Sequence, residues 1–410
     1  MPRCPRLGES VNAISLDVPP VEAAEQQPEW EDPAQVAQIR DVLASLPPLI
    51  EAESLPTFQS SLADVAAGHA QVLQAGDCAE DPAECTAEHV RRKVDLLDAL
   101  AATMSAATGR PVVRVGRIAG QYAKPRSRPT EQVDGVDLPV YRGHLVNDPA
   151  ATRPARRPDP QRLLAGYRSA RRTLSELGTV RAAGAPVWTS HEALLLDYEV
   201  PMLRRDRAGR VALTSTHWPW IGERTRQLDG AHVALLAQVV NPVACKVGPT
   251  MTVVDLLALC ARLDPLREPG RLTLIARLGA DVVADRLPPL VRAVRAAGHP
   301  VVWLVDPLHG NTVTAATGRK TRILSTILRE VTAFQIAVHA EGGVAGGVHL
   351  ETTPDDVTEC LDDGHSSEPA RLRYTSLCDP RLNPRQAQTV VSAWRTSPLT
   401  NRAEEKPCRA

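Results

Sequence analysis

The sequence predicts an α/β protein built on a (β/α)8 TIM barrel, with a short N-terminal extension and extra loops and helices. Between residues 71 and 351, eight short apolar segments alternate with helical patterns, which is typical of parallel strands joined by crossover helices. The length of 410 residues suits one large barrel with additions, because such barrels span about 200 to more than 400 residues. Polar and charged residues follow most of the apolar segments, and that end of a barrel is where sites are built.

The N-terminal part of the chain precedes the first strand. Residues 1–30 are rich in Pro and Glu and show little periodicity, which predicts a partly ordered arm. Residues 34–46 and 55–67 place apolar side chains three and four apart, so two helices are expected there. We therefore expect an arm at 1–30, one barrel domain with its N-terminal helices at 31–398, and a tail at 399–410.

The barrel strands are expected where apolar runs end in Gly, Pro or charged residues. They lie at residues 72–76, 112–119, 186–190, 218–222, 242–247, 272–278, 301–305 and 347–351. Helical patterns lie between most of them, at residues 86–107, 161–177, 231–240, 253–263, 282–297 and 321–340. The third and fourth strands are placed more by position than by periodicity. Residues 123–160, rich in Pro, Arg and Asp, are expected to form a long loop over one mouth of the barrel.

Composition excludes several classes of protein. A formal net charge of −1 gives no bulk attraction to nucleic acid or membrane, so any anion-binding surface must be local. No segment approaches the roughly 18 uninterrupted apolar residues of a membrane span, and the N-terminus lacks the apolar core of a signal peptide, so a cytoplasmic protein is expected. The eight cysteines include no CxxC pair, which fits reduced thiols better than disulfides or a zinc ribbon.

Cationic residues form the first chemical class at the expected strand ends. Converging Arg and Lys side chains suit small dianions, because carboxylate and phosphate groups accept paired hydrogen bonds from arginine. Phosphorylated substrates are therefore implied. The alternative is that each arginine pairs with a neighbouring acid and closes the barrel rim. The class comprises Arg117, Lys124, Arg126, Arg224, Lys246 and Arg277.

A thiol, an imidazole and two carboxylates form the second class: Cys78, His309, Glu351 and Asp379. A mixed S, N and O set suits Mn²⁺, Co²⁺, Fe²⁺ or Zn²⁺, whereas Mg²⁺ avoids thiolate. Only the barrel would bring these residues together, and each has an alternative. Cys78 could be a small buried apolar residue, His309 could hold its own turn, and the two acids could pair with the arginines.

Three further features are interpreted as structural. The glycines of residues 342–347 lack the ending of a phosphate-binding loop and are expected to let the chain pack closely as it enters the last strand. Trp220 and Trp303 are expected in the barrel core, and the basic stretch 153–157 is expected to be a solvated loop.

Six motifs together resemble the type II 3-deoxy-D-arabino-heptulosonate 7-phosphate (DAHP) synthases. They cover most of the expected barrel and read QAGDCAE at 74–80, RIAGQYAKPRS at 117–127, WIGERTRQLDGAH at 220–232, NPVACKVGP at 241–249, DPLHGNT at 306–312 and CDPRLN at 378–383. The resemblance implies a (β/α)8 barrel and a transferase that condenses phosphoenolpyruvate with erythrose 4-phosphate and water. The products are DAHP and phosphate, at the first step of the shikimate pathway.

The resemblance also implies roles for individual residues. A divalent metal, Mn²⁺ or Co²⁺ before Zn²⁺ or Fe²⁺, would act as a Lewis acid on the aldehyde, with Lys246 as proton donor or relay and Asp306 orienting the sugar or a metal-bound water. The metal ligands would be Cys78, His309, Glu351 and Asp379. Phosphoenolpyruvate would be held by Arg117, Glu223, Arg224, Lys246 and Arg277, and the sugar phosphate by Lys124, Arg126 and Ser127.

The sequence departs from the family pattern in two motifs. The usual QGGDC is QAGDC here, and the usual Arg-Gly-Asp is Arg142-Gly143-His144, which bears on the sugar-phosphate side. The arm is short, and residues 178–186 lead almost directly into the next strand, without the additional helical pair that feedback-regulated members carry. We therefore expect weak or no inhibition by aromatic amino acids, as in short forms that serve secondary metabolism.

Several alternatives stay open at this level. One is an amino-DAHP synthase that uses an imino sugar phosphate. Others are a non-catalytic barrel that binds sugar phosphates and a hydrolytic metalloenzyme. A homodimer or higher homo-oligomer is expected, and the resemblance allows chorismate mutase as a protein partner.

Overall fold

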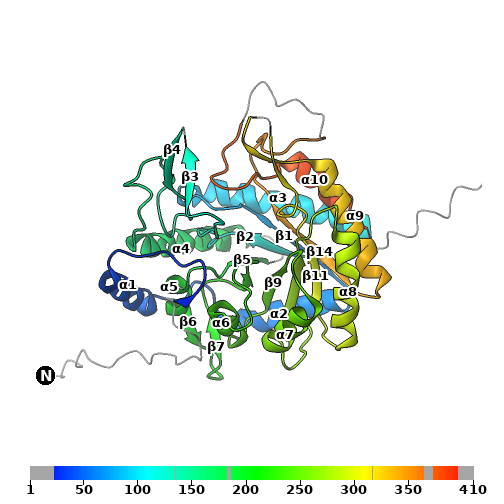
Figure 1. Cartoon of the computed structure of the whole chain (residues 1–410). Coiled ribbons are helices and arrows are strands. Elements are labelled where there is room, and N and C mark those ends of the chain that lie inside the picture. Colours follow the sequence, from blue (N-terminus) through cyan, green and yellow to red (C-terminus); the bar gives the residue numbers. More distant parts are fainter. Residues whose placement is uncertain (1–22, 134, 182–185, 316, 364–372, 396–410) are drawn as a thin grey trace, which may run out of the picture.

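Eight parallel strands form a closed barrel, as the sequence predicts (Figure 1). The structure is a computed structural model that describes residues 23–133, 135–181, 186–315, 317–363 and 373–395. The strands follow the order β1-β14-β11-β10-β9-β8-β5-β2 around the barrel. Their bounds are β1 Gln71–Gly76, β2 Val112–Arg117, β5 Val187–Glu192, β8 Trp218–Ile221, β9 Val243–Val247, β10 Leu272–Ala276, β11 Val302–Val305 and β14 Ala345–Glu351.

Helices surround this barrel and pack on one another in sequence order. Their bounds are α3 Ala87–Thr108, α4 Gln161–Arg181, α6 Ala231–Ala237, α7 Val253–Leu263, α8 Val283–Ala296, α9 Leu324–Ala340 and α10 Pro384–Ser392. Helix α10, which the sequence pattern did not predict, closes the ring by packing between α9 and α3. It begins with a capping box in which Asn383 and Gln386 bond each other's backbone N–H groups.

The N-terminal helix α1 (Pro33–Ser45) completes the ring where the barrel's own connection is irregular. Between β5 and β8 the chain forms α5 (Leu196–Glu199), η4 (Val200–Met202) and a hairpin of β6 (Leu203–Arg205) with β7 (Val211–Leu213). Helix α1 packs against α4, α5 and η4. A segment from before the barrel therefore covers the apolar surface that a regular third helix would bury.

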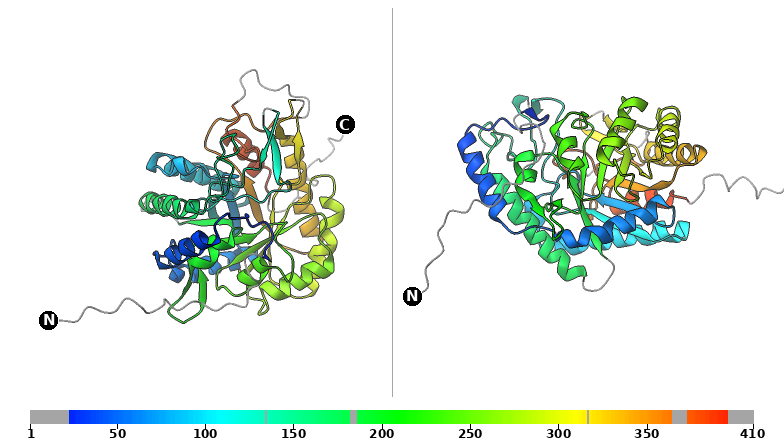
Figure 2. Two further views of the ribbon diagram at one scale, coloured as in Figure 1. Left: turned by 60° about the vertical axis from the view of Figure 1, so that its left-hand side comes forward. Right: turned by 90° about the horizontal axis from the view of Figure 1, so that it is seen from below.

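The second N-terminal helix, α2 (Leu55–Ala66), preceded by η2 (Ala52–Ser54), closes one end of the barrel. Its Phe58, Leu62 and Val65 are fully buried and join the apolar cluster inside the barrel, which includes Trp188 and Trp218. Figures 1 and 2 show α2 against the barrel on the side away from hairpin β3–β4. The open mouth is therefore at the carboxyl ends of the strands.

Alternation along each strand divides the barrel interior into an apolar and a polar layer. In β1 and β2, for example, apolar Val72 and Val115 belong to the interior cluster, and two residues later Gln74 and Arg117 are buried nearer the mouth. Because side chains alternate between the two faces, residues two apart share the interior face. All of β11 is buried, which confirms the strand expected at 301–305.

Two hairpins lie on segments that were expected to be loop or helix. β3 (Thr130–Val133) pairs with β4 (Val136–Pro139) inside the loop expected at 123–160, and β12 (Thr312–Thr314) pairs with β13 (Lys320–Arg322). The helix expected from residue 321 therefore begins at Leu324 instead. The expectation of a solvated stretch at 153–157 was wrong for Arg156, which is buried and paired with Glu131 at 2.6 Å.

The glycines before and within β14 do permit close packing, because a Cβ on Gly347 would lie 2.0 Å from the Val72 carbonyl oxygen. The domain bounds stay predictions, and residues 1–22 and 396–410 lie outside the described residues. In the part of the chain that the structure describes, no helix is long and apolar enough to cross a membrane.

Candidate active site and metal centre

The mouth of the barrel contains a cavity of about 780 Å³. It brings together the eight residues expected to hold substrates: Arg117, Lys124, Arg126, Ser127, Glu223, Arg224, Lys246 and Arg277. Two of the expected metal ligands, His309 and Asp379, also line it. Residues from five strand ends and two long loops therefore meet in one space, as a barrel requires for a site.

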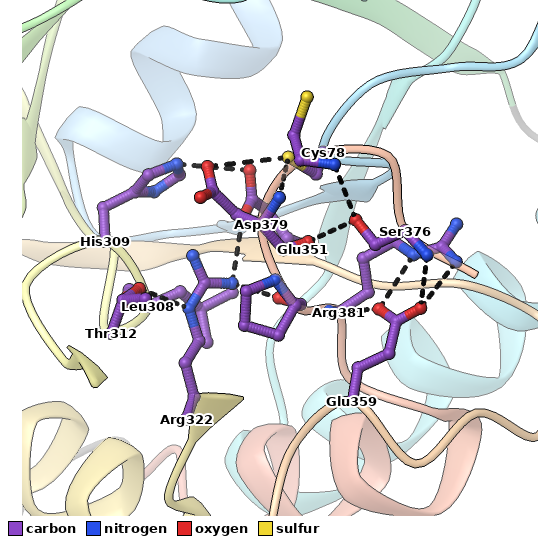
Figure 3. A network of polar contacts seen from close by, with 12 residues as sticks. Cys78, Leu308, His309, Thr312, Arg322, Glu351, Glu359, Ser376, Asp379 and Arg381 are labelled. Atoms are coloured by element: carbon purple, nitrogen blue, oxygen red, sulfur yellow. Dashed lines mark hydrogen bonds and ion pairs between the residues drawn. The ribbon is translucent and has the colours of Figure 1, made fainter. Parts of the chain in front are cut away.

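The expected metal ligands lie together at one side of this cavity (Figure 3). Donor atoms of Cys78, Glu351 and Asp379 all lie within 4.8 Å of one another. The thiol of Cys78 lies 3.7 Å from Asp379 Oδ2 and accepts the Asp379 backbone N–H at 3.2 Å. His309 joins them through Nε2, which lies 3.2 Å from Glu351 Oε1.

Buried ion pairs hold the segments that carry these ligands. Arg381 binds Asp77 Oδ1 at 2.8 Å, and so ties the segment of Asp379 to that of Cys78. It also binds Glu359 at 2.9 Å (Figure 3). On its other oxygen, Asp77 pairs with Lys93 of α3 at 2.7 Å. Each charge is satisfied inside the protein, as a buried charge requires.

The Glu351 carboxylate lies at the centre of a cluster of positive charge. Arg322 Nη1 lies 2.8 Å from it, Arg117 Nη2 3.0 Å and Lys124 Nζ 3.5 Å. Burial opposes ionisation of Glu351, but the charges of His309, Lys124 and Arg322 outweigh it and hold its pKa well below the usual value. Burial likewise opposes ionisation of Asp379, and Lys124 dominates the charges that lower its pKa. Both carboxylates are therefore anionic donors at neutral pH.

The donor set fits a divalent metal. His309 Nδ1 donates to Asp306 Oδ2 at 2.7 Å. In the neutral ring the lone pair of Nε2 therefore faces a Glu351 oxygen, whereas the charged ring carries a proton there. Two acceptors 3.2 Å apart need a proton or a cation between them. Burial raises the pKa of the Cys78 thiol well above its usual value, so metal binding there would release a proton. One thiolate, one imidazole and two carboxylates suit a borderline divalent ion.

Asp306 connects His309 to Lys246. Lys246 Nζ lies 2.5 Å from Asp306 Oδ2, and Asp306 Oδ1 accepts the N–H groups of Leu308 and His309, both at 3.2 Å. Burial lowers the pKa of Lys246 to about 8, although Asp306 acts in the opposite direction. Lys246 can therefore give up its proton near physiological pH, which suits a general acid.

The cations of the cavity are held in place by the protein itself. Arg117 donates to the Asp77 carbonyl at 2.9 Å and stacks on Trp220, with Cζ 5.2 Å from the ring centroid. Arg277 donates to the His309 carbonyl at 3.2 Å. Arg224 donates to Ser127 Oγ at 2.5 Å, and so joins the two groups of expected substrate residues.

Comparison with known proteins identifies the family. A family model described as "Class-II DAHP synthetase family" matches residues 20–186 and 178–393. The chain belongs to this family. The resemblance expected from the six motifs is confirmed.

Curated relatives in the class-II DAHP synthetase family match nearly the whole chain. A "Probable phospho-2-dehydro-3-deoxyheptonate aldolase" of Pseudomonas fluorescens is 58% identical over 379 residues, which cover 91% of this chain and 95% of the relative. A "Phospho-2-dehydro-3-deoxyheptonate aldolase" of Streptomyces coelicolor is 42% identical over 417 residues, which cover 89% of this chain and 93% of the relative. One solved structure, of the same-named enzyme from Francisella tularensis, has a TM-score of 0.53 at 13% identity. It covers 86% of this chain and 95% of that chain, and shows the fold alone.

In this class-II DAHP synthetase family member, a polar chain inside the barrel was missed from the sequence. His349 Nε2 accepts from Arg117 Nη1 at 2.7 Å, His349 Nδ1 donates to Gln74 at 2.7 Å, and Gln74 donates to Ser190 at 3.0 Å. Burial holds the pKa of His349 well below the usual value, so it is neutral and can accept from Arg117. His349 lies two residues before Glu351 on β14, and residues two apart on a strand share a face, so the position of Glu351 also indicates that of His349.

Two cations from the β12–β13 hairpin were also missed. Lys320 lines the cavity and pairs with Asp379 Oδ1 at 2.8 Å, and Arg322 pairs with Glu351. Trp220 was expected in the core and belongs both to the core cluster and to the cavity lining. His144, which stands where the family usually has Asp, is not among the described residues that line the cavity.

Proposed function

We propose that this protein is a DAHP synthase, which condenses phosphoenolpyruvate with erythrose 4-phosphate and water to give DAHP and phosphate. The observation that carries the proposal is the cavity, in which a cluster of cations lies beside the four donors of the expected metal centre. Two phosphorylated, anionic substrates need such a cluster, in a chain whose net charge is only −1. The family and the printed names of the curated relatives support the same activity.

The two substrates divide the cations between them. Arg117, Lys246 and Arg277 lie on or directly after barrel strands, and we assign them, with Glu223 and Arg224, to phosphoenolpyruvate. Lys124, Arg126 and Ser127 lie on the loop after β2, and we assign them to the sugar phosphate. Lys320 faces the same space from the hairpin and is added to this second group. The hydrogen bond between Arg224 and Ser127 supports an arrangement in which the two subsites are neighbours.

Cys78, His309, Glu351 and Asp379 would hold a divalent metal, for which Mn²⁺ or Co²⁺ is proposed before Zn²⁺ or Fe²⁺. When bound, the metal supplies a Lewis acid for the aldehyde of the sugar phosphate. Asp306 orients the His309 ring, because its carboxylate accepts the Nδ1 proton and leaves Nε2 free to bind.

The chemistry follows from the placement of the protein's own groups. The arginines fix phosphoenolpyruvate so that its C3 faces the aldehyde carbon, and a C–C bond forms between these atoms. Lys246 donates a proton to the aldehyde oxygen, which becomes a hydroxyl. Water then adds to C2 of the former phosphoenolpyruvate and loses a proton. The C2–O bond to phosphate breaks while the new C2 hydroxyl gives its proton to the departing phosphate, which leaves the ketone of DAHP and free phosphate.

The proposal is tested by following phosphate release from phosphoenolpyruvate in the presence of Mn²⁺. We expect one phosphate per erythrose 4-phosphate consumed and no release without it. Release at the same rate without an aldehyde acceptor would indicate a hydrolase and refute the proposal. An imino sugar phosphate, tested as acceptor in the same assay, distinguishes the amino-DAHP alternative. The absence of any release would leave only the binding-protein alternative.

A further inference from the structure

A short segment before the barrel, residues 23–30, contacts the loop that carries the sugar-phosphate residues. Gln26 Oε1 accepts the backbone N–H of Arg126 at 2.8 Å, across 100 positions in the sequence. The Gln26 carbonyl accepts from Arg142 Nη2 at 2.6 Å. The Arg142 carbonyl in turn accepts the backbone N–H of Lys124 at 2.9 Å. Gln26 and Arg142 thus hold the backbone of this loop on both sides of Pro125.

The next residue fixes the same segment to the chain after β5, the strand that pairs with β2 in the barrel. The Gln27 side chain donates to the Leu194 carbonyl at 2.9 Å and accepts the Leu196 N–H at 3.0 Å. Trp30 Nε1 donates to Asp197 Oδ2 at 2.8 Å. Adjacent glutamines therefore bond to two different loops.

Gln26 adopts a backbone conformation that non-glycine residues rarely take. Its φ of 63° lies in the left-handed region, which is disfavoured for residues with a Cβ. The bonds to Arg126 and Arg142 offset this preference, and the conformation turns the Gln26 side chain toward the loop after β2. Unusual backbone conformations of this kind persist where surrounding contacts determine them.

We infer that Gln26 is a positioning residue for the sugar-phosphate subsite. This inference rests on the proposed function. Gln26 fixes the backbone of Arg126 while Glu131 binds the Arg126 guanidinium at 2.9 Å. Arg117, Lys246 and Arg277 lie on or directly after barrel strands. Arg224 contacts this loop through Ser127, so loss of the Gln26 acceptor should affect the sugar phosphate much more than phosphoenolpyruvate.

The test substitutes Gln26→Met, which keeps the side-chain length and removes the acceptor. The matched control is Gln27→Met, the same change in the neighbouring residue. KM for each substrate and kcat are measured for both variants and the wild type, with thermal unfolding to verify that each is folded. One hydrogen bond corresponds to a change of about 3- to 10-fold. We expect KM for erythrose 4-phosphate to rise by about this factor in Gln26→Met, while KM for phosphoenolpyruvate stays within about twofold.

Each other outcome overturns the inference. An unchanged KM for erythrose 4-phosphate, or an equal rise for both substrates, shows that Gln26 does not position this subsite. An equal effect of Gln27→Met assigns the role to the whole segment and not to Gln26. A wild-type protein that releases no phosphate refutes the proposed function instead. Calorimetric titration of inorganic phosphate into wild type and Gln26→Met then tests the inference, and equal affinities overturn it.

Discussion

The pKa of Lys246 is expected to set the upper pH limit of the reaction. Its side chain is buried, and burial lowers its pKa from 10.5 to about 8, with Arg117 acting in the same direction and Asp306 in the opposite one. A pKa lowered from 10.5 to about 8 corresponds to roughly 3 kcal/mol against the charged form. The penalty of burial is therefore larger than the attraction of the ion pair with Asp306.

The sign of the pH dependence follows from the role of Lys246 as a proton donor. The protonated form is active, so the rate is highest below pH 8 and falls as pH rises through the pKa. With a pKa of about 8, roughly 90% of the lysine is protonated at pH 7 and roughly 10% at pH 9. We therefore expect kcat to fall about ninefold to tenfold between these two values.

Lys246→Arg isolates this effect, because arginine stays protonated at any pH used in the assay. The variant should lose rate overall, since a guanidinium replaces an ammonium 2.5 Å from Asp306, and its remaining activity should lack the fall near pH 8. Kcat is measured from pH 6 to 10 with saturating substrates, and bound metal is determined at each pH. A fall near pH 8 that persists unchanged in Lys246→Arg would refute the assignment.

Two further predictions concern stability and regulation. Glu330 of α9 accepts the N–H of Gly279 at 2.8 Å and the amide N–H of Asn311 at 2.5 Å. Burial raises the pKa of Glu330 to about 7. The native state therefore binds more protons than the unfolded state between about pH 4.5 and 7. Stability should therefore fall as pH rises through this window in the wild type and not in Glu330→Gln. Glu330→Gln should also cost about 1–3 kcal/mol at pH 5, because its amide N–H groups face other donors. Free energies of unfolding are measured by urea titration at pH 5 and 8, and equal values for the wild type at the two pH values would contradict the expected pH dependence. The connection from α4 at Arg181 to β5 at Val187 is short, and we expect added Phe, Tyr or Trp to inhibit weakly or not at all. Strong inhibition of the rate by any of them disproves this expectation.

The regular part of the fold was predictable because burial imposes periodicity. Strands such as Val302–Val305 are apolar on both faces, and the long helices repeat every three to four residues. The hairpin strands were missed because they are only three or four residues long, and some of them, such as β12, are largely exposed. Helix α10 was missed because it has only nine residues and follows the turn at Asn383. Short elements are specified by pairing and caps more than by pattern.

The candidate site was predictable to the extent that its residues follow strand ends. Arg117 ends β2 and Glu351 ends β14, so a barrel topology alone places both at one mouth. His349 was missed because a histidine in the middle of an apolar strand also suits the core. The bond of Gln26 to Arg126 connects segments 100 residues apart, and no local pattern predicts such a contact.

The dependence of the condensation on metal tests the account most directly. Protein treated with chelator and then dialysed is titrated with Mn²⁺, while bound metal and phosphate release from the two substrates are measured together. We predict no turnover without metal, and activity that returns in proportion to one bound ion per chain. Cys78→Ala should bind the ion more weakly and need more of it. Full activity with no bound metal would contradict the central claim.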